Sequence, residues 1–133
     1  MPEHARNKIL IVEDELMIAE LIRNAIKNEG MQAESFERAD DGIAYLRDHA
    51  DEILLIVTDV KTPGHADGVA LTRFAREHWP DIPVIISTAF NLPDDIVALH
   101  GVGVLKKPWS IEDLIDVVLK GAQQPSIRDI GLA

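Results

Sequence analysis

Five side chains that can bind a metal or handle a phosphate stand where short apolar runs of the sequence end. They are Glu13, Asp14, Asp59, Thr88 and Lys107. Carboxylates held close together repel one another unless a cation neutralises them, and a small set of oxygen ligands favours Mg²⁺. A carboxylate beside such a metal can attack phosphorus, and an ammonium and a hydroxyl can stabilise the charge that develops. Brought together by the fold, these residue types indicate metal-assisted phosphoryl transfer to an aspartate.

The segments before these residues predict strands, with helices between them. Runs 8–12 and 53–57 are apolar without alternation, which is typical of strands buried on both faces of a sheet. The other predicted strands are the more polar 31–36, then 82–87 and 102–105. Helical spacing of apolar residues predicts helices over 16–29, 39–50, 67–79, a short one within 93–100, and one from 110 onward. The last opens on Ser110-Ile111-Glu112-Asp113, which resembles a capping box.

Strand and helix therefore alternate five times along the chain. This order predicts an α/β fold in which right-handed crossovers build a parallel sheet with helices on both faces. Ligands of such sheets bind at the carboxyl ends of the strands. The five side chains follow the first, third, fourth and fifth strands, so we expect them to converge on one edge of the sheet.

Composition narrows the class of protein. A chain of 133 residues fits one domain, and the absence of cysteine excludes disulfides and thiolate sites. With 23 acidic and 13 basic residues the net charge is −10, which argues against a nucleic-acid-binding surface. The polar N-terminus has no signal-peptide core, and no apolar run approaches the ~20 residues that span a bilayer. We therefore expect a soluble, cytoplasmic protein that binds neither nucleic acid nor membrane.

The motifs together resemble the receiver domain of bacterial two-component response regulators. The matching pattern is Glu13-Asp14, Asp59 with Pro63 four residues on, Thr88-Ala89 and Lys107-Pro108, each at the end of its expected strand. The resemblance covers about residues 7–121 and leaves 122–133 as a short tail without an output domain. It implies a flavodoxin-like (βα)5 three-layer sandwich with strand order 2-1-3-4-5.

The resemblance also assigns roles at a magnesium site. It implies that Asp59 is the phosphoacceptor and a metal ligand, that Asp14 binds Mg²⁺ directly, and that Glu13 binds it directly or through water. The backbone carbonyl of Lys61 would be a further ligand. The implied phosphodonor is a histidine kinase, a phosphotransfer protein or a small phosphodonor. The signal would pass to a downstream protein that the sequence does not name, and a homodimer that forms on phosphorylation is left open.

The same resemblance gives the remaining site residues their parts. Lys107 would pair with Asp59 or its phosphate. The Lys107-Pro108 peptide is expected to be cis, because only a peptide bond before proline adopts the cis form at a low cost in free energy. Thr88 would donate its hydroxyl to a phosphate oxygen and move inward on phosphorylation. The protein would thus be a phosphorylatable switch with only self-catalysed transfer and autodephosphorylation, rather than an enzyme acting on other molecules.

Three features depart from the family pattern. Val104 stands where receivers usually carry Tyr or Phe, and the interval from Thr88 to Lys107 is shorter than usual by about three residues in our comparison. We therefore expect a truncated helix between strands four and five, and output through an altered surface. The turn over 63–68 is one residue longer than the frequent pattern. Lys61 and Phe90 occupy positions that tune aspartyl-phosphate hydrolysis in the family.

Each residue also has a structural alternative. Asp14 could cap the first helix, Asp59 could form a turn, and Thr88 could satisfy the backbone at a strand end. Ser87 offers a competing hydroxyl. Because side chains alternate along a strand, only one of Lys106 and Lys107 can enter the site, and the following proline favours Lys107. The five histidines, Trp79 and Trp109 are interpreted as surface or packing residues.

Three other functions compete with the receiver interpretation. A haloacid-dehalogenase-like phosphatase needs a second aspartate two residues after the nucleophile, where this chain has Lys61. A flavodoxin-like cofactor binder needs a phosphate loop after the first strand, where Glu13-Asp14-Glu15 would repel phosphate. A pseudo-receiver that never takes phosphate conflicts with the intact set of site residues, although Val104 keeps that alternative open.

Overall fold

The computed structural model describes residues 6–61, 64 and 67–123. Its elements in chain order are β1 (Lys8–Val12), α1 (Leu16–Asn28), β2 (Gln32–Phe36), α2 (Ala39–His49), the 3₁₀ turn η2 (Ala50–Glu52), β3 (Ile53–Asp59), α3 (Gly68–His78), β4 (Val84–Thr88), α4 (Asp94–Val97), β5 (Val102–Lys106) and α5 (Ile111–Gln123). The predicted alternation of strand and helix is confirmed, and most predicted ends agree to within two residues. None of these helices is both long and apolar enough to cross a bilayer.

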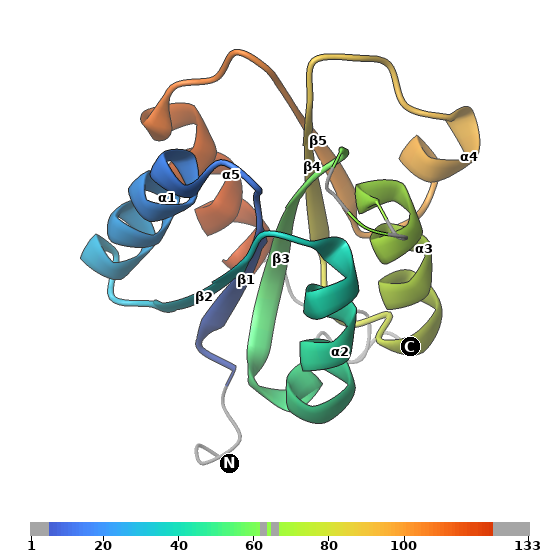
Figure 1. Ribbon diagram of the computed structural model, residues 1–133, viewed down its shortest axis with the longest axis horizontal. Coiled ribbons are helices and arrows are strands. Elements are labelled where there is room, and N and C mark those ends of the chain that lie inside the picture. Colours follow the sequence, from blue (N-terminus) through green and yellow to red (C-terminus); the bar gives the residue numbers. More distant parts are fainter. Residues whose placement is uncertain (1–5, 62–63, 65–66, 124–133) are drawn as a thin grey trace.

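The five strands form one sheet in the order β2-β1-β3-β4-β5, and every neighbouring pair is parallel. The predicted fold class and strand order are therefore confirmed (Figure 1). β2 is the most polar strand and lies at an edge, where one of its sides has no partner strand. β1 and β3 lie inside the sheet and are almost completely buried, which explains their unbroken apolar runs.

Helices cover both faces of the sheet, and each face has its own apolar core (Figure 1). α1 and α5 pack on one face through Ile22, Ile26, Leu114 and Val118. On the other face lie α2, α3 and the short α4, with Leu46, Leu71, Ala75 and Ile96 in the core. Successive strand residues alternate between these cores: Ile9 and Ile11 point to one, Leu10 and Val12 to the other.

The helix between β4 and β5 is truncated, as predicted. α4 has only four residues, Asp94–Val97. Arg73 of α3 donates from Nη1 to Asp95 at 2.6 Å and ties this short helix to its neighbour. The predicted capping box of α5 is also confirmed: the Asp113 amide donates to Ser110 Oγ at 3.0 Å, and the Asp113 carboxylate accepts from the Ser110 amide at 3.3 Å.

Gly68 begins α3 against the end of β3. Its amide donates to the carbonyl of Val60 at 2.7 Å, and a Cβ at this position would collide with the backbone carbonyl of Asp59. The next constraint on this helix is Asp67, whose carboxylate accepts from the Ala70 amide at 2.9 Å as an N-cap. α3 can approach the end of β3 this closely only because residue 68 has no side chain.

We expect Gly68→Ala to lower the free energy of unfolding by about 1–3 kcal/mol, since an added methyl group must displace backbone atoms. Chemical denaturation measures the change. The matched control is Gly103→Ala in β5, where the new methyl would meet only Ile85 Cγ1 at 3.9 Å. An equal loss in both variants would contradict the argument from close approach.

Candidate functional site

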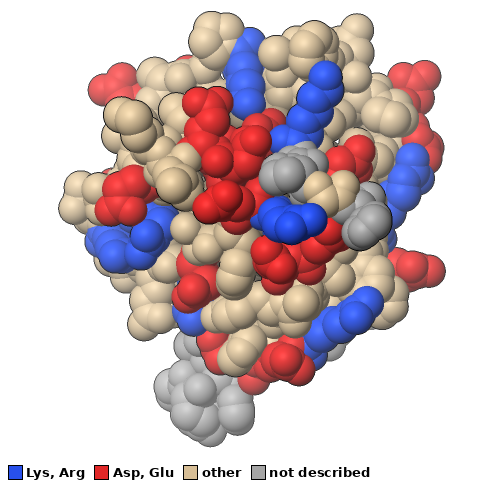
Figure 2. Space-filling view, viewed as in Figure 1, with Lys and Arg blue, Asp and Glu red and all other residues tan. Residues whose placement is uncertain are grey.

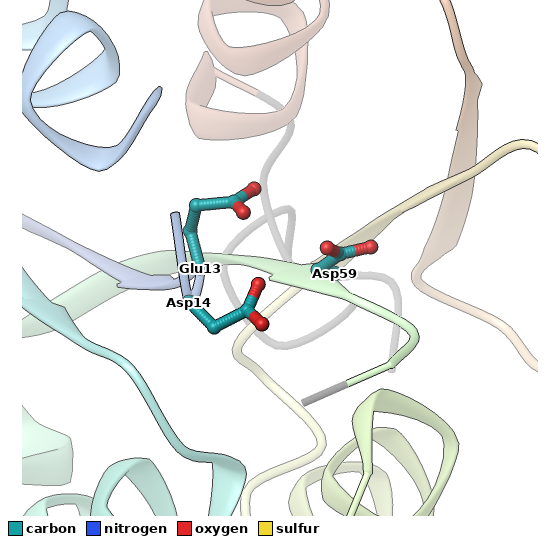
Figure 3. A group of neighbouring side chains, drawn as sticks. All are labelled: Glu13, Asp14 and Asp59. Carbon is teal, nitrogen blue, oxygen red and sulfur yellow. The ribbon is translucent and has the colours of Figure 1, made fainter. Parts of the chain in front are cut away.

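Three carboxylates meet where β1 and β3 end side by side. Val12 pairs with Thr58 in the sheet, so Glu13, Asp14 and Asp59 leave neighbouring strands at the same edge. Figure 3 shows their carboxylates converging on one space. Carboxylate oxygens from all three lie within 4.8 Å of one another. The predicted convergence is therefore present, and the separation is short enough for one cation to contact all three groups.

The three groups differ in their exposure. Glu13 is 4% exposed and Asp59 is 9% exposed, whereas Asp14 is open to solvent. Glu15 is the N-cap residue of α1 and its side chain makes no capping bond, so the interpretation of Asp14 as the cap is not supported. Glu13 Oε2 instead accepts from the Glu15 amide at 3.2 Å. The acidic run after β1 thus leaves the exposed Asp14 carboxylate facing the shared space.

Asp59 is held by two donors. Asp59 Oδ1 accepts from the Val60 amide at 2.9 Å and from Lys107 Nζ at 3.0 Å. Among the residues that the structure describes, both donors contact Oδ1, so Oδ2 is the oxygen available to a cation or to phosphorus. The predicted pairing of Lys107 with Asp59 is present across 48 positions of sequence.

The end of β5 directs one lysine inward and the other outward. The Lys107 amide donates to the Thr88 carbonyl at 2.9 Å, which fixes the end of β5 beside the end of β4. Lys106 is exposed and its Nζ donates to Asn91 Oδ1 at 3.3 Å. Lys107 is therefore the lysine that reaches Asp59, as predicted, and Lys106 points away from it. The Lys107-Pro108 peptide is cis, as expected.

The two adjacent hydroxyls of β4 have different partners. Ser87 Oγ accepts from Trp109 Nε1 at 2.8 Å, a hydrogen bond that the sequence did not reveal. Thr88 is 2% exposed, and its Oγ1 accepts from the Phe90 amide at 3.0 Å and donates to the Phe90 carbonyl at 3.2 Å. Ser87 is thus occupied elsewhere, while Thr88 satisfies the backbone after its strand, as its structural alternative anticipated.

Burial and the neighbouring carboxylates both affect the pKa of Glu13. Its pKa is raised to about 7, mainly because burial disfavours the charged form, and the Asp59 and Asp14 carboxylates add to the rise. The Glu15 amide and the Lys107 ammonium act in the opposite direction but do not cancel it. Figure 2 shows acidic side chains gathered near the middle of one face, with basic side chains beside them. The arrangement as a whole favours a bound cation.

Lys61 and Phe90 form a contact that sequence reasoning missed. The Lys61 ammonium lies 5.1 Å from the centroid of the Phe90 ring. Both positions were singled out, but a contact between residues 29 apart has no local signal. The role of the Lys61 carbonyl as a metal ligand stays a prediction. Half of the unusual turn over 63–68 lies outside the described residues, namely positions 63, 65 and 66, as do His4 and the tail from 124 onward.

Comparison with curated proteins finds regulators of transcription. The chain is 30% identical over 116 residues to the DNA-binding transcriptional regulator NtrC of Proteus hauseri, covering 85% of this chain and 24% of that protein. It is 32% identical over 120 residues to the transcriptional regulatory protein RprY of Bacteroides fragilis, covering 85% and 49%. The chain thus spans about a quarter to a half of the length of these relatives.

Comparison with solved structures and with families of domains agrees. The receiver protein of Sinorhizobium medicae has a TM-score of 0.79 at 23% identity, covering 88% of this chain and 94% of that one, which supports the fold. Residues 9–119 match the family model of the response regulator receiver domain. That match runs from the second residue of β1 through β5 and contains every residue of the site. The chain belongs to the response regulator receiver domain family, the phosphoacceptor switches of two-component signalling.

Proposed function

We propose that Asp59 of this receiver domain accepts a phosphoryl group in a magnesium-dependent reaction. The observation that carries the proposal is the salt bridge from Lys107 to Asp59 inside a cluster of three carboxylates. The salt bridge positions a buried carboxylate, and the cluster supplies oxygen ligands beside it. No aspartate stands two residues after Asp59, which disfavours the phosphatase alternative.

The residues present fit a magnesium ion. Glu13, Asp14 and Asp59 would hold it, with the Lys61 carbonyl as a further oxygen ligand, since a hard cation with few protein ligands takes its other oxygens from water and phosphate. Burial of Glu13, with a smaller contribution from the neighbouring Asp59 and Asp14 carboxylates, raises its pKa to about 7, and a bound cation would favour its charged form. When bound, Mg²⁺ would neutralise the carboxylates and the charge on the transferred phosphoryl oxygens.

The residues of the chain then divide the work. Asp59 Oδ2 forms the bond to phosphorus, and the bond from phosphorus to the donor's nitrogen or oxygen breaks, with the electron pair leaving on the donor. Lys107 holds Oδ1 and remains beside the phosphoryl oxygens as their charge grows. Thr88 Oγ1 can donate its hydrogen bond to a phosphoryl oxygen, which is a stronger acceptor than the Phe90 carbonyl.

Receiver domains work with kinases or phosphotransfer proteins. We propose a histidine kinase or a phosphotransfer protein as the donor here, and a change of protein contacts as the output. The domain limits 7–121 and the cytoplasmic location stay predictions. DNA binding belongs to the relatives as whole proteins, of which this chain resembles only a part.

The first test of this function is loading of the site. We expect Mg²⁺ with beryllofluoride, which imitates a phosphoryl group on a carboxylate, to shift the amide resonances of Asp59 and Thr88. In the Trp79→Phe variant, which leaves Trp109 as the one tryptophan, fluorescence should change as well. With acetyl phosphate and Mg²⁺, intact mass should rise by one phosphoryl group.

Matched variants separate the alternatives. Asp59→Asn should abolish phosphoryl incorporation, and Lys107→Met should slow it by roughly 100-fold, because it removes a charge that stabilises the transition state. The control is Asp116→Asn, at an exposed aspartate of α5 that pairs with Lys120. It should change neither the amount nor the rate of phosphoryl incorporation. A silent wild type would favour the pseudo-receiver, and steady phosphate release from phosphomonoesters would favour the phosphatase.

The second test uses pH and needs no phosphodonor. Because the pKa of Glu13 is about 7 in the folded protein and 4.5 ordinarily, its proton stabilises the metal-free fold below pH 4.5, and that contribution is lost as the pH rises through 7. We expect Glu13→Gln to raise the free energy of unfolding at pH 8 by about 1–3 kcal/mol. The gain should vanish near pH 4.5, as urea unfolding would show.

Two controls accompany this measurement. Glu15→Gln changes an exposed carboxylate two residues away whose side chain makes no capping bond, and it should give no such gain. Adding Mg²⁺ at pH 8 should stabilise the wild type more than Glu13→Gln. Equal stability of wild type and Glu13→Gln at pH 8 without metal would refute the crowding that we infer.

A further inference from the structure

Phe90 is an exposed aromatic residue that contacts two residues of the proposed phosphorylation site, Thr88 and Lys61. It is 63% exposed and stands two residues beyond Thr88, in the segment between β4 and α4. Among the described residues, two restraints of different kinds hold it: one comes from Thr88 at the end of β4, and the other from Lys61, two residues after Asp59. One acts on its backbone and the other on its ring.

The backbone restraint comes from Thr88. Its Oγ1 accepts from the Phe90 amide at 3.0 Å and donates to the Phe90 carbonyl at 3.2 Å. A hydroxyl has a single hydrogen. A phosphoryl group on Asp59 would be an anionic acceptor, to which hydrogen bonds are shorter and stronger than to a neutral carbonyl. If Thr88 donates to that group, it gives up the hydrogen bond that it donates to the Phe90 carbonyl, and only the bond that it accepts from the Phe90 amide can remain.

The ring restraint comes from Lys61, two residues beyond Asp59. Its ammonium lies 5.1 Å from the centroid of the Phe90 ring, and Lys61 is itself exposed. Cation–π contacts at exposed sites are weak. A phosphoryl group brings up to two negative charges to the neighbourhood of the same ammonium and competes with the ring for it. One chemical event therefore weakens both restraints.

The surface beside the site lacks an aromatic side chain on β5. Val104, which pairs with Ile86 in the sheet, puts a small aliphatic side chain at 39% exposure on the β5 side. We propose that Phe90, in place of an aromatic residue on β5, carries the phosphorylation state of Asp59 to the surface by leaving its contacts with Thr88 and Lys61. This inference rests on the proposed function and adds its route of output.

The restraints further along the chain limit how far the change extends. Arg73 Nη1 binds Asp95 at 2.6 Å and ties α4 to α3, and neither residue contacts the site in the structure. Lys106 reaches back to Asn91 at 3.3 Å across an exposed contact. We therefore expect the movement to be largest in the segment between Thr88 and α4, and small in α4 itself.

The test follows the three phenylalanine rings by aromatic carbon–proton NMR. On adding Mg²⁺ and beryllofluoride, we expect the Phe90 ring resonances to shift, while those of Phe36 and Phe74, which pack against Tyr45 and Trp79, do not. Phe90→Leu assigns the signal. Amide shifts should be large from Thr88 to Asn91 and small in α4.

Two failures can be told apart in the same sample. If the Asp59 and Lys107 amides respond but the Phe90 ring does not, the site is loaded and this inference is overturned. If those amides are silent, the proposed function fails and takes the inference with it.

Variants test each restraint separately. In unloaded protein, Lys61→Met should shift the Phe90 ring part of the way toward its loaded position, whereas Lys106→Met, at an exposed lysine paired with Asn91, should leave the ring in place. Thr88→Val should shift the Phe90 amide without ligand and suppress its response to beryllofluoride. A Phe90 signal unaffected by both Lys61→Met and Thr88→Val would overturn the proposal.

Discussion

Repulsion among the carboxylates of Glu13, Asp14 and Asp59 is the constraint on which the functional site depends. Two of these groups are nearly buried, and oxygens of all three lie within 4.8 Å of one another. Such proximity is unfavourable unless cations offset it. Lys107 supplies one positive charge at 3.0 Å from Asp59, against three carboxylates, and burial together with the neighbouring carboxylates raises the pKa of Glu13 to about 7. The site is therefore suited to a divalent cation.

The sheet holds these groups in place against their repulsion. The side chains of β1 and β3 are buried among two apolar cores, and the register of the two strands places their ends together. Burial of this much apolar surface contributes far more free energy than the crowding of a few carboxylates costs. Lys107 directly follows β5, which lies two strands beyond β3 in the sheet. It reaches Asp59 because its amide is bound to the Thr88 carbonyl at the end of β4. Fold stability and site geometry thus have the same source.

Two of the three departures from the family pattern fall between the end of β4 and the end of β5, and the third is the turn that follows β3. Val104 replaces an aromatic residue, α4 has four residues, and Phe90 is exposed beside Lys61. Val104, α4 and Phe90 all belong to the segment from the end of β4 to β5. The carboxylate cluster and Lys107, in contrast, keep the family pattern. The proposed phosphoryl transfer therefore depends on residues that follow the family pattern, whereas the proposed output depends on a segment that departs from it.

The sequence by itself predicted the fold class, most residues of the strands, and the three carboxylates and the lysine that the structure brings together, because apolar runs, helical periodicity and charged residues at strand ends are local patterns. It also predicted the truncated α4, since the short interval before Lys107 leaves room for little else. It could not reveal the hydrogen bond from Trp109 to Ser87, the contact of Lys61 with Phe90, or which donors hold Asp59 Oδ1. Those join residues far apart in the chain, and only tertiary packing decides which side chains meet, and with what distance and burial.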